Sequence, residues 1–167
     1  PSGLDHILFI LALFFLTRNF GILLFQMTLF TLAHSLTLGL SLYGFVHVPS
    51  APVEIAIALS IAFVAAENLF SDKISRWRPW VVFASGLVHG LGFAHSFEQR
   101  VVESENFLPA LFSFNMGIEF GQIAVIAIAF AAVSLWWNRE WYGRLIARPA
   151  SVVIALWGCY WAVERTF

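Results

Sequence analysis

The sequence predicts an all-α, polytopic transmembrane helical bundle of about six spans. Hydrophobic residues make up 60% of the 167 residues and charged residues only 11%, whereas a soluble domain is typically about half apolar and about a quarter charged. The mean hydropathy is +0.82. The apolar runs are continuous and do not alternate every second residue, which disfavours a transmembrane β-barrel. We therefore expect one transmembrane domain over residues 1–167 and no water-soluble globule.

Six apolar runs predict the individual helices, because a spanning helix needs roughly 20 mostly apolar residues. Turn-forming or charged residues separate the runs. In chain order, these breaks are residues 19–21, 49–52, 76–79, 103–106 and 144–149. The expected spans are residues 3–17, 21–44, 52–70, 79–97, 107–133 and 149–163. The first and the last are short.

Positive charges predict the orientation of the bundle. One set of alternate loops holds seven of the nine basic residues, which are Arg18, Lys73, Arg76, Arg78, Arg139, Arg144 and Arg148. The positive-inside rule places this set in the cytoplasm and therefore both termini outside. Five tryptophans cluster at the same end, as expected at a headgroup boundary; they are Trp77, Trp80, Trp136, Trp137 and Trp141. The chain starts without Met or a basic signal region, so we expect it to begin inside a longer one.

Composition excludes several classes of function. The net charge is -1 and the basic residues are scattered, which argues against nucleic-acid binding. The single cysteine, Cys159, cannot form an internal disulfide or a thiolate cluster. No phosphate-binding Gly-x-x-x-x-Gly-Lys-[Ser/Thr] loop is present, so ATP hydrolysis is not expected. Any metal site must therefore use histidine, carboxylate and amide ligands.

A polar stripe crosses the fifth apolar run. Asn115, Glu119 and Gln122 are spaced i, i+4 and i+7, which puts their side chains on one face of a helix. An ionised group at bilayer depth costs about 2.5 to 3.5 kcal/mol on insertion scales, so it usually faces the bundle interior. Gly117 and Gly121 would let another helix approach closely. The stripe predicts either three oxygen ligands or a hydrogen-bond cluster that only holds helices together.

Two histidines lie near the centres of other spans, His34 in the second and His89 in the fourth. A single buried histidine is more often a core residue than a ligand. Two at matching depth beside a mid-span glutamate favour metal binding or a proton relay, because imidazole is a common metal ligand.

Further polar residues lie towards the ends of the spans. Asp5 and His6 open the first span, and His95 is near the outer end of the fourth. These three predict an outer site that strips water from a cation in stages. Glu67, near the inner end of the third span, is placed as an exit ligand would be, although an ion pair with nearby basic residues would give the same pattern.

Four segments resemble the HupE/UreJ family of bacterial membrane proteins. They are GLDHILF at 3–9, TLAHSLT at 31–37, GLVHGLGFA at 86–94 and FNMGIE at 114–119. The resemblance covers spans one to five and implies a nickel or cobalt permease of the bacterial inner membrane. It implies that Asp5 and His6 are needed for metal uptake. It also implies a further histidine, and often an extracytoplasmic domain, ahead of the first span.

The favoured hypothesis is a secondary permease, not an enzyme, that moves a divalent transition metal ion. Ligands with imidazole, carboxylate and amide groups suit Ni²⁺, Co²⁺ or Zn²⁺ better than Cu(I), and the resemblance singles out nickel. No organic cofactor is expected; the partners are the metal ion and the lipid bilayer, with a homo-oligomer left open. The alternatives are a haem electron-transfer protein with His34 and His89 as axial ligands and, more remotely, an intramembrane metalloenzyme.

Overall fold

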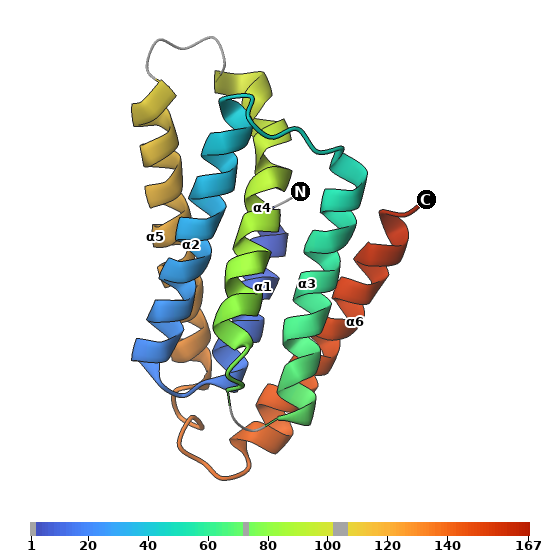
Figure 1. Cartoon of the computed structure of the whole chain (residues 1–167). Helices are drawn as coiled ribbons and strands as arrows, with labels where there is room; N and C mark the ends of the chain where they lie inside the picture. The colour runs from blue at the N-terminus through green and yellow to red at the C-terminus, as the bar shows by residue number, and fades with distance from the viewer. Residues whose placement is uncertain (1–2, 72–73, 102–106) are drawn as a thin grey trace.

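The computed structural model describes residues 3–71, 74–101 and 107–167, with side chains except at 95–101, 107 and 108. This part of the chain is helical and contains no strand. The helices run alternately up and down (Figure 1). They are α1 (Gly3–Leu16), α2 (Phe20–Leu42), α3 (Ser50–Phe70), α4 (Arg78–Val101), α5 (Phe107–Val133) and α6 (Arg148–Glu164), with a π-helical turn, η1 (Gly143–Ala147), directly before α6. Each expected span corresponds to one helix.

Four helical segments within the described residues are long and apolar enough to cross a membrane. They are Phe20–Leu42, Ser50–Phe70, Pro109–Val133 and the continuous Gly143–Glu164. Helix α1 is apolar but has only 14 residues, which at 1.5 Å per residue is about 21 Å, against a hydrocarbon core of about 30 Å. Helix α4 is not among the four. A full set of six crossings therefore stays a prediction.

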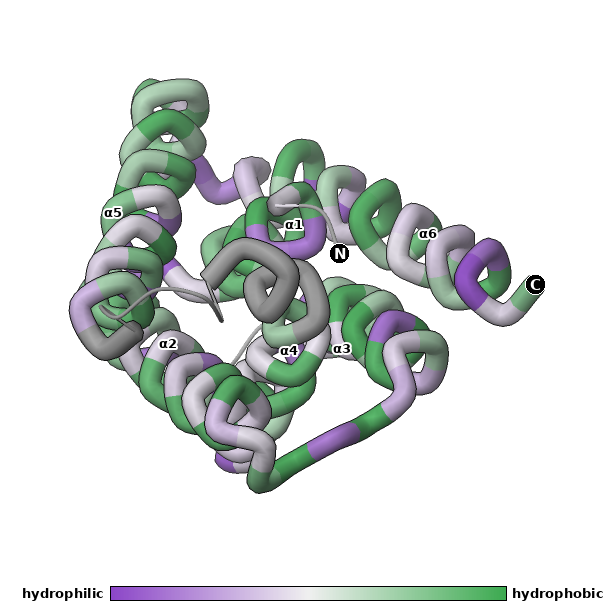
Figure 2. Tube along the Cα trace, turned by 90° about the horizontal axis from the view of Figure 1, so that it is seen from above, coloured by the Kyte–Doolittle hydropathy of each residue, from purple (hydrophilic) through white to green (hydrophobic). Residues whose placement is uncertain are grey.

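The bundle is apolar outside, and its mainly hydrophobic core contains several buried polar residues. Large hydrophobic side chains are exposed on the outer faces of α2, α3, α5 and α6, among them Leu32, Phe63, Phe120 and Leu156. Hydrophobic residues recur along all the helices, and α5 and α6 form the two flanks with α1 and α4 between them (Figure 2). The buried residues include charged, amide and imidazole side chains. The extensive exposed apolar surface is unlike that of a soluble globule and suits a lipid environment.

Glycines bring two pairs of helices into close contact. On α4, a Cβ at Gly90 would collide with the carbonyl oxygen of His34 and the hydroxyl of Thr37 on α2. The same Thr37 hydroxyl donates to the Leu87 carbonyl at 2.7 Å. On α6, a Cβ at Gly158 would lie 2.8 Å from the Ala62 backbone nitrogen of α3. Helix α4 is therefore fixed against α2, and α6 against α3.

The expected close approach at Gly117 and Gly121 is wrong. Apart from the adjoining backbone of α5 itself, no atom of the described residues lies within 4 Å of a Cβ built at either position. The tight contact uses Gly86 and Gly90 instead, because these glycines on α4 face the backbone of α2. Gly121 borders a cavity.

Local signals define both ends of α2. The side chain of Asn19 accepts hydrogen bonds from the backbone N–H groups of Gly21 at 2.9 Å and Ile22 at 3.2 Å, which satisfies two donors of the first turn. After the helix, Gly44 adopts a left-handed φ of 77°, which glycine tolerates without steric cost. The turn residues therefore set the length of the helix that carries His34.

Two residues expected at the basic end of the bundle are buried instead. Arg78, counted with the loop cations, is 0% exposed and pairs with Glu67 at 3.1 Å. Trp137, expected at the headgroup boundary, packs against Phe14 and Tyr142. The other four tryptophans of this set are exposed, as a boundary position requires.

Candidate metal centre

Three histidines from three helices meet inside the bundle. His6 lies on α1, His34 on α2 and His89 on α4, and all three are buried. The ring centroid of His6 lies 5.3 Å from that of His34 and 4.9 Å from that of His89. The rings meet edge to face, at 77° and 84°. The glycine contact between α4 and α2 supports this arrangement, since Gly90 directly follows His89 and lies against the backbone of His34.

Most of the ring nitrogens lack a hydrogen-bond partner within the described residues. Both nitrogens of His6, both of His34 and Nδ1 of His89 are buried and unpartnered. The remaining nitrogen, Nε2 of His89, lies 3.2 Å from the hydroxyl oxygen of Ser60 on α3. A buried polar group without a partner costs about 1–3 kcal/mol, and such groups in native proteins call for an explanation. These are therefore not ordinary, satisfied core histidines.

Aromatic side chains surround the histidines, and a cavity reaches one of them. Phe30 packs on His6 and His89, with centroid distances of 5.4 and 5.1 Å, and Phe93 packs on His6 and His34 at 4.9 and 5.6 Å. A cavity of about 270 Å³ lies between α1, α4 and α5 and is lined by His6. The apolar surroundings lower the local dielectric, which strengthens any interaction between a cation and the centre.

The predicted separation of an outer site from a central site is wrong for His6. The sequence places Asp5 and His6 at the outer end of their span, whereas His6 contacts both mid-span histidines. Helix α1 is short, and its described part begins level with the interior of the longer helices (Figure 1). His95 lies outside the described side chains.

Asp5 is buried and paired with a cation from the other end of the chain. Its Oδ1 accepts a hydrogen bond of 2.8 Å from Arg165, which directly follows α6. Arg165 also donates to the carbonyl of Glu54 at 3.0 Å. Asp5 Oδ2 has no partner within the described residues. One oxygen of Asp5 is therefore engaged and the other is unpartnered.

The three polar residues of the α5 stripe differ in how closely they approach the neighbouring helix α2. Gln122 is buried and accepts a hydrogen bond of 3.3 Å from Thr31 on α2. Asn115 approaches His34, while its amide donates to the Leu111 carbonyl at 2.9 Å. Glu119 is half-buried, and no hydrogen bond or ion pair joins it to the histidines in the described structure. The two amides therefore face α2 more closely than the carboxylate does.

Glu67 belongs to a buried network at the other end of the bundle. Its two oxygens accept hydrogen bonds from Ser75 at 2.6 Å and from Arg78 at 3.1 Å. Arg78 also donates to the side chain of Asn68 at 3.2 Å. The ion-pair alternative thus describes Glu67 better than an exit ligand does, with Arg78 as the partner.

The described residues contain no preformed group of three or more His, Cys, Asp or Glu side chains arranged to hold a metal ion. Sequence reasoning also missed three buried or partnered polar residues. Ser60 contacts His89, and Arg165 pairs with Asp5. Gln26 on α2 is buried with both amide atoms unpartnered, and its position within an apolar run was a signal that could have found it.

The apolar exterior and the buried polar centre define a helical membrane protein with an internal polar site. The chain belongs to the HupE/UreJ family, since the family described as HupE/UreJ protein matches residues 1–165. This match confirms the resemblance drawn from the four motifs. Searches among curated proteins and among solved structures give no match.

Proposed function

We propose that this protein is a permease that carries a divalent transition metal ion, most favourably Ni²⁺, through the interior of its helical bundle. The HupE/UreJ family is associated with nickel and cobalt transport. In this proposal, His6, His34 and His89 form the central binding site for the ion. The protein acts as a transporter, not an enzyme. The chain would lie in the bacterial inner membrane with both termini outside.

One observation carries the proposal: five nitrogens without a partner among the described residues, on three buried imidazoles of which His6 lies against the other two. A protein that needed these residues only for packing would gain stability from apolar side chains of similar size, because an unmade hydrogen bond is costly. A passing cation supplies the missing partner. Neutral imidazole binds Ni²⁺, Co²⁺ and Zn²⁺ well, and ligand type alone does not separate these ions.

The spacing of the rings suits a transient ligand set. Imidazole nitrogens bind a zinc-like ion at about 2.1 Å, which puts the centroids of two ligand rings roughly 5 Å apart. The observed separations are 5.3 and 4.9 Å. Rotation of the rings, with little movement of the helices, would then turn their nitrogens toward a common ion. A site that must be assembled in this way holds its cargo less tightly than a preformed one, which favours release.

Asp5 and the α5 amides complete the proposed path. Asp5 keeps one oxygen for the ion while Arg165 holds the other. Asn115 adds an amide oxygen beside His34. Because Gln122 lines the 270 Å³ cavity together with His6, that cavity is the proposed approach to the centre. Glu119 is half-buried on α5, and in this proposal its carboxylate attracts the cation towards the approach.

The packing does not favour a haem between His34 and His89. The ring of His6 lies against both of them, and Phe30 and Phe93 pack on the same group. A macrocycle between two axial ligands would have to displace these side chains. An absorbance scan of the purified protein tests this alternative directly, because a Soret band would support it.

Uptake of radioactive Ni²⁺ into proteoliposomes tests the proposal. Replacing His6, His34 or His89 singly with Gln should lower the initial rate at least about tenfold, since even outer-shell partners of a metal are worth roughly 10–100-fold. The matched control is His47→Gln, which changes an exposed loop histidine and should leave uptake unchanged.

Thermal melting of each variant separates loss of function from loss of fold. Uptake by folded His34→Gln and His89→Gln proteins at the wild-type rate would overturn the proposed role of the centre. Competition by Co²⁺ and Zn²⁺ in the same assay then ranks the ions.

A further inference from the structure

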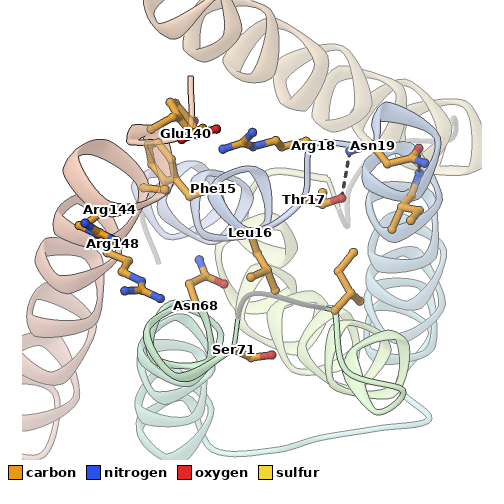
Figure 3. Close-up of a pocket in the computed structure, with 15 residues that line it drawn as sticks. Phe15, Leu16, Thr17, Arg18, Asn19, Asn68, Ser71, Glu140, Arg144 and Arg148 are labelled. Atoms are coloured by element: carbon orange, nitrogen blue, oxygen red, sulfur yellow. Dashed lines mark hydrogen bonds between the residues drawn. The ribbon is translucent and has the colours of Figure 1, made fainter. Parts of the chain in front are cut away.

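A second cavity lies away from the histidines, at the end of the bundle where α1 and α3 finish and η1 begins. Its volume is about 860 Å³, within the range of small-molecule sites. Arg18, Arg144 and Arg148 line it with one carboxylate, that of Glu140. Figure 3 shows Arg144 and Arg148 on one side of the cavity and Arg18 and Glu140 along another. Arg18 and the pair Arg144 and Arg148 are far apart in the sequence, but their side chains line the same cavity.

The charges of this cavity select against a metal cation. Arg18 comes from the connection between α1 and α2, and Arg144 comes from η1. Guanidinium groups stay charged at any physiological pH and repel a divalent cation across a partly enclosed space. They bind phosphate oxygens through paired N–H donors. The described lining therefore has the character of an anion site, with Glu140 as an opposing charge.

A buried hydroxyl in the same lining lacks a partner. Tyr142 is 1% exposed, and its hydroxyl has no hydrogen-bond partner within the described residues. Burial raises the pKa of Tyr142 to about 12, although nearby Arg18 acts in the opposite direction. The hydroxyl therefore keeps its proton and can donate to an anion. The guanidinium of Arg18 lies 5.2 Å from the centroid of this ring, so the donor and the cation are neighbours.

The position of the cavity narrows the class of anion. Exposed tryptophans occur at the same end of the bundle, including Trp77 and Trp80 at the start of α4 and Trp136 and Trp141 before η1. Exposed indoles of this kind mark a membrane–water boundary. Basic pockets between transmembrane helices at such a boundary bind lipid head groups. The π-helical turn that carries Arg144 is also a type of structure frequently found at functional sites.

We propose that this cavity binds a phosphate group, held by Arg18 and Arg144 with the hydroxyl of Tyr142 as a further donor. Two sources supply such a group at this boundary, the head group of an anionic phospholipid and free phosphate. The inference is independent of metal transport, and its test does not require transport activity.

Native mass spectrometry of the full chain, released from detergent micelles doped with equal amounts of phosphatidylglycerol and phosphatidylcholine, tests the proposal. The wild-type protein should retain phosphatidylglycerol selectively. The double variant Arg18→Gln/Arg144→Gln should lose that retention about tenfold or more, because each charge-assisted hydrogen bond contributes substantially. The matched control is Arg76→Gln/Arg139→Gln, which removes two charges at the same end but outside the cavity lining.

Two single-site variants probe the lining without a large change in shape. Tyr142→Phe removes only the unpartnered hydroxyl and should weaken retention severalfold while leaving the fold intact. Glu140→Gln removes the opposing charge and should increase retention. These variants keep the proposal testable even if the double arginine variant does not fold.

A second arm, ³¹P NMR of inorganic phosphate with the detergent-solubilised protein, distinguishes the sources. Selective lipid retention that excess phosphate does not displace identifies a head group. Phosphate line broadening that disappears in Arg18→Gln/Arg144→Gln, without lipid selectivity, identifies free phosphate. Equal lipid retention and equal phosphate broadening in the wild-type, cavity-variant and control proteins would overturn the proposal.

Discussion

At the residue scale, the same amino acid has different consequences at different places in this bundle. Gly90 lies against the backbone of α2, whereas a Cβ at Gly117 would meet nothing within 4 Å. His47 is exposed in a loop, whereas His34 is buried with both nitrogens unpartnered. Residue type identifies a candidate, but the neighbouring helix decides what the residue does.

We expect Gly90→Ala to destabilise the protein by about 1–3 kcal/mol, because the added methyl group would force α4 away from α2. Gly117→Ala should be neutral or stabilising by up to about 1 kcal/mol, since alanine favours a helix over glycine. Chemical denaturation in detergent measures both. Equal stabilities for the two variants would show that the glycine contact does not hold α4 in place.

At the element scale, a buried polar network joins four helices at the basic end of the bundle. Arg78 at the start of α4 donates to Glu67 and Asn68 of α3 and to the Ala12 carbonyl of α1. Asn68 also donates to Ser151 of α6 at 3.0 Å. Because these contacts converge on one guanidinium, they fix the relative register of helices that otherwise pack through apolar surfaces.

Arg78→Met should destabilise the bundle by about 3–5 kcal/mol, because it leaves the carboxylate of Glu67, whose side chain is only 15% exposed, without its cation. The double variant Arg78→Met/Glu67→Gln should recover part of this loss, since the remaining group is neutral. A double-mutant cycle of unfolding free energies provides the measurement. Strict additivity of the two single effects would contradict the proposed coupling.

At the scale of the whole molecule, apolar side chains lie around the outside of the bundle and exposed arginines lie at one end. Hydrophobic side chains cover the outer faces of the helices, while Arg18, Arg139 and Arg144 are exposed at one end. The start of α1 and the end of α6 lie in the other half of the bundle (Figure 1). The positive-inside rule predicts that the arginine-rich end faces the cytoplasm.

Cysteine labelling tests this orientation. In a Cys159→Ser background, His47→Cys should react with a membrane-impermeant maleimide on intact spheroplasts. Arg139→Cys should react only after permeabilisation. Both positions are exposed connections at opposite ends of the bundle. The reverse labelling pattern would place the basic end outside and invert the proposed direction of uptake.

Much of the fold could be predicted because helix positions depend on local properties. Long apolar runs and turn residues such as Asn19 act within a few residues of the chain. The candidate site was predicted less fully. His34 and His89 were expected at matching depth, but the depth of His6 follows from how far α1 reaches into the bundle. The pairing of Asp5 with Arg165 joins opposite ends of the chain and has no local signal.

The sequence by itself determined an all-helical chain with apolar helices, a basic end and polar residues within the spans, because composition and spacing are properties of each segment alone. Only the tertiary structure decided that His6 joins His34 and His89, that Glu67 pairs with Arg78, and that arginines surround a cavity. These meetings depend on the rotation and depth of each helix. Those are set by close contacts such as that of Gly90 with α2, which arise only when the helices pack together.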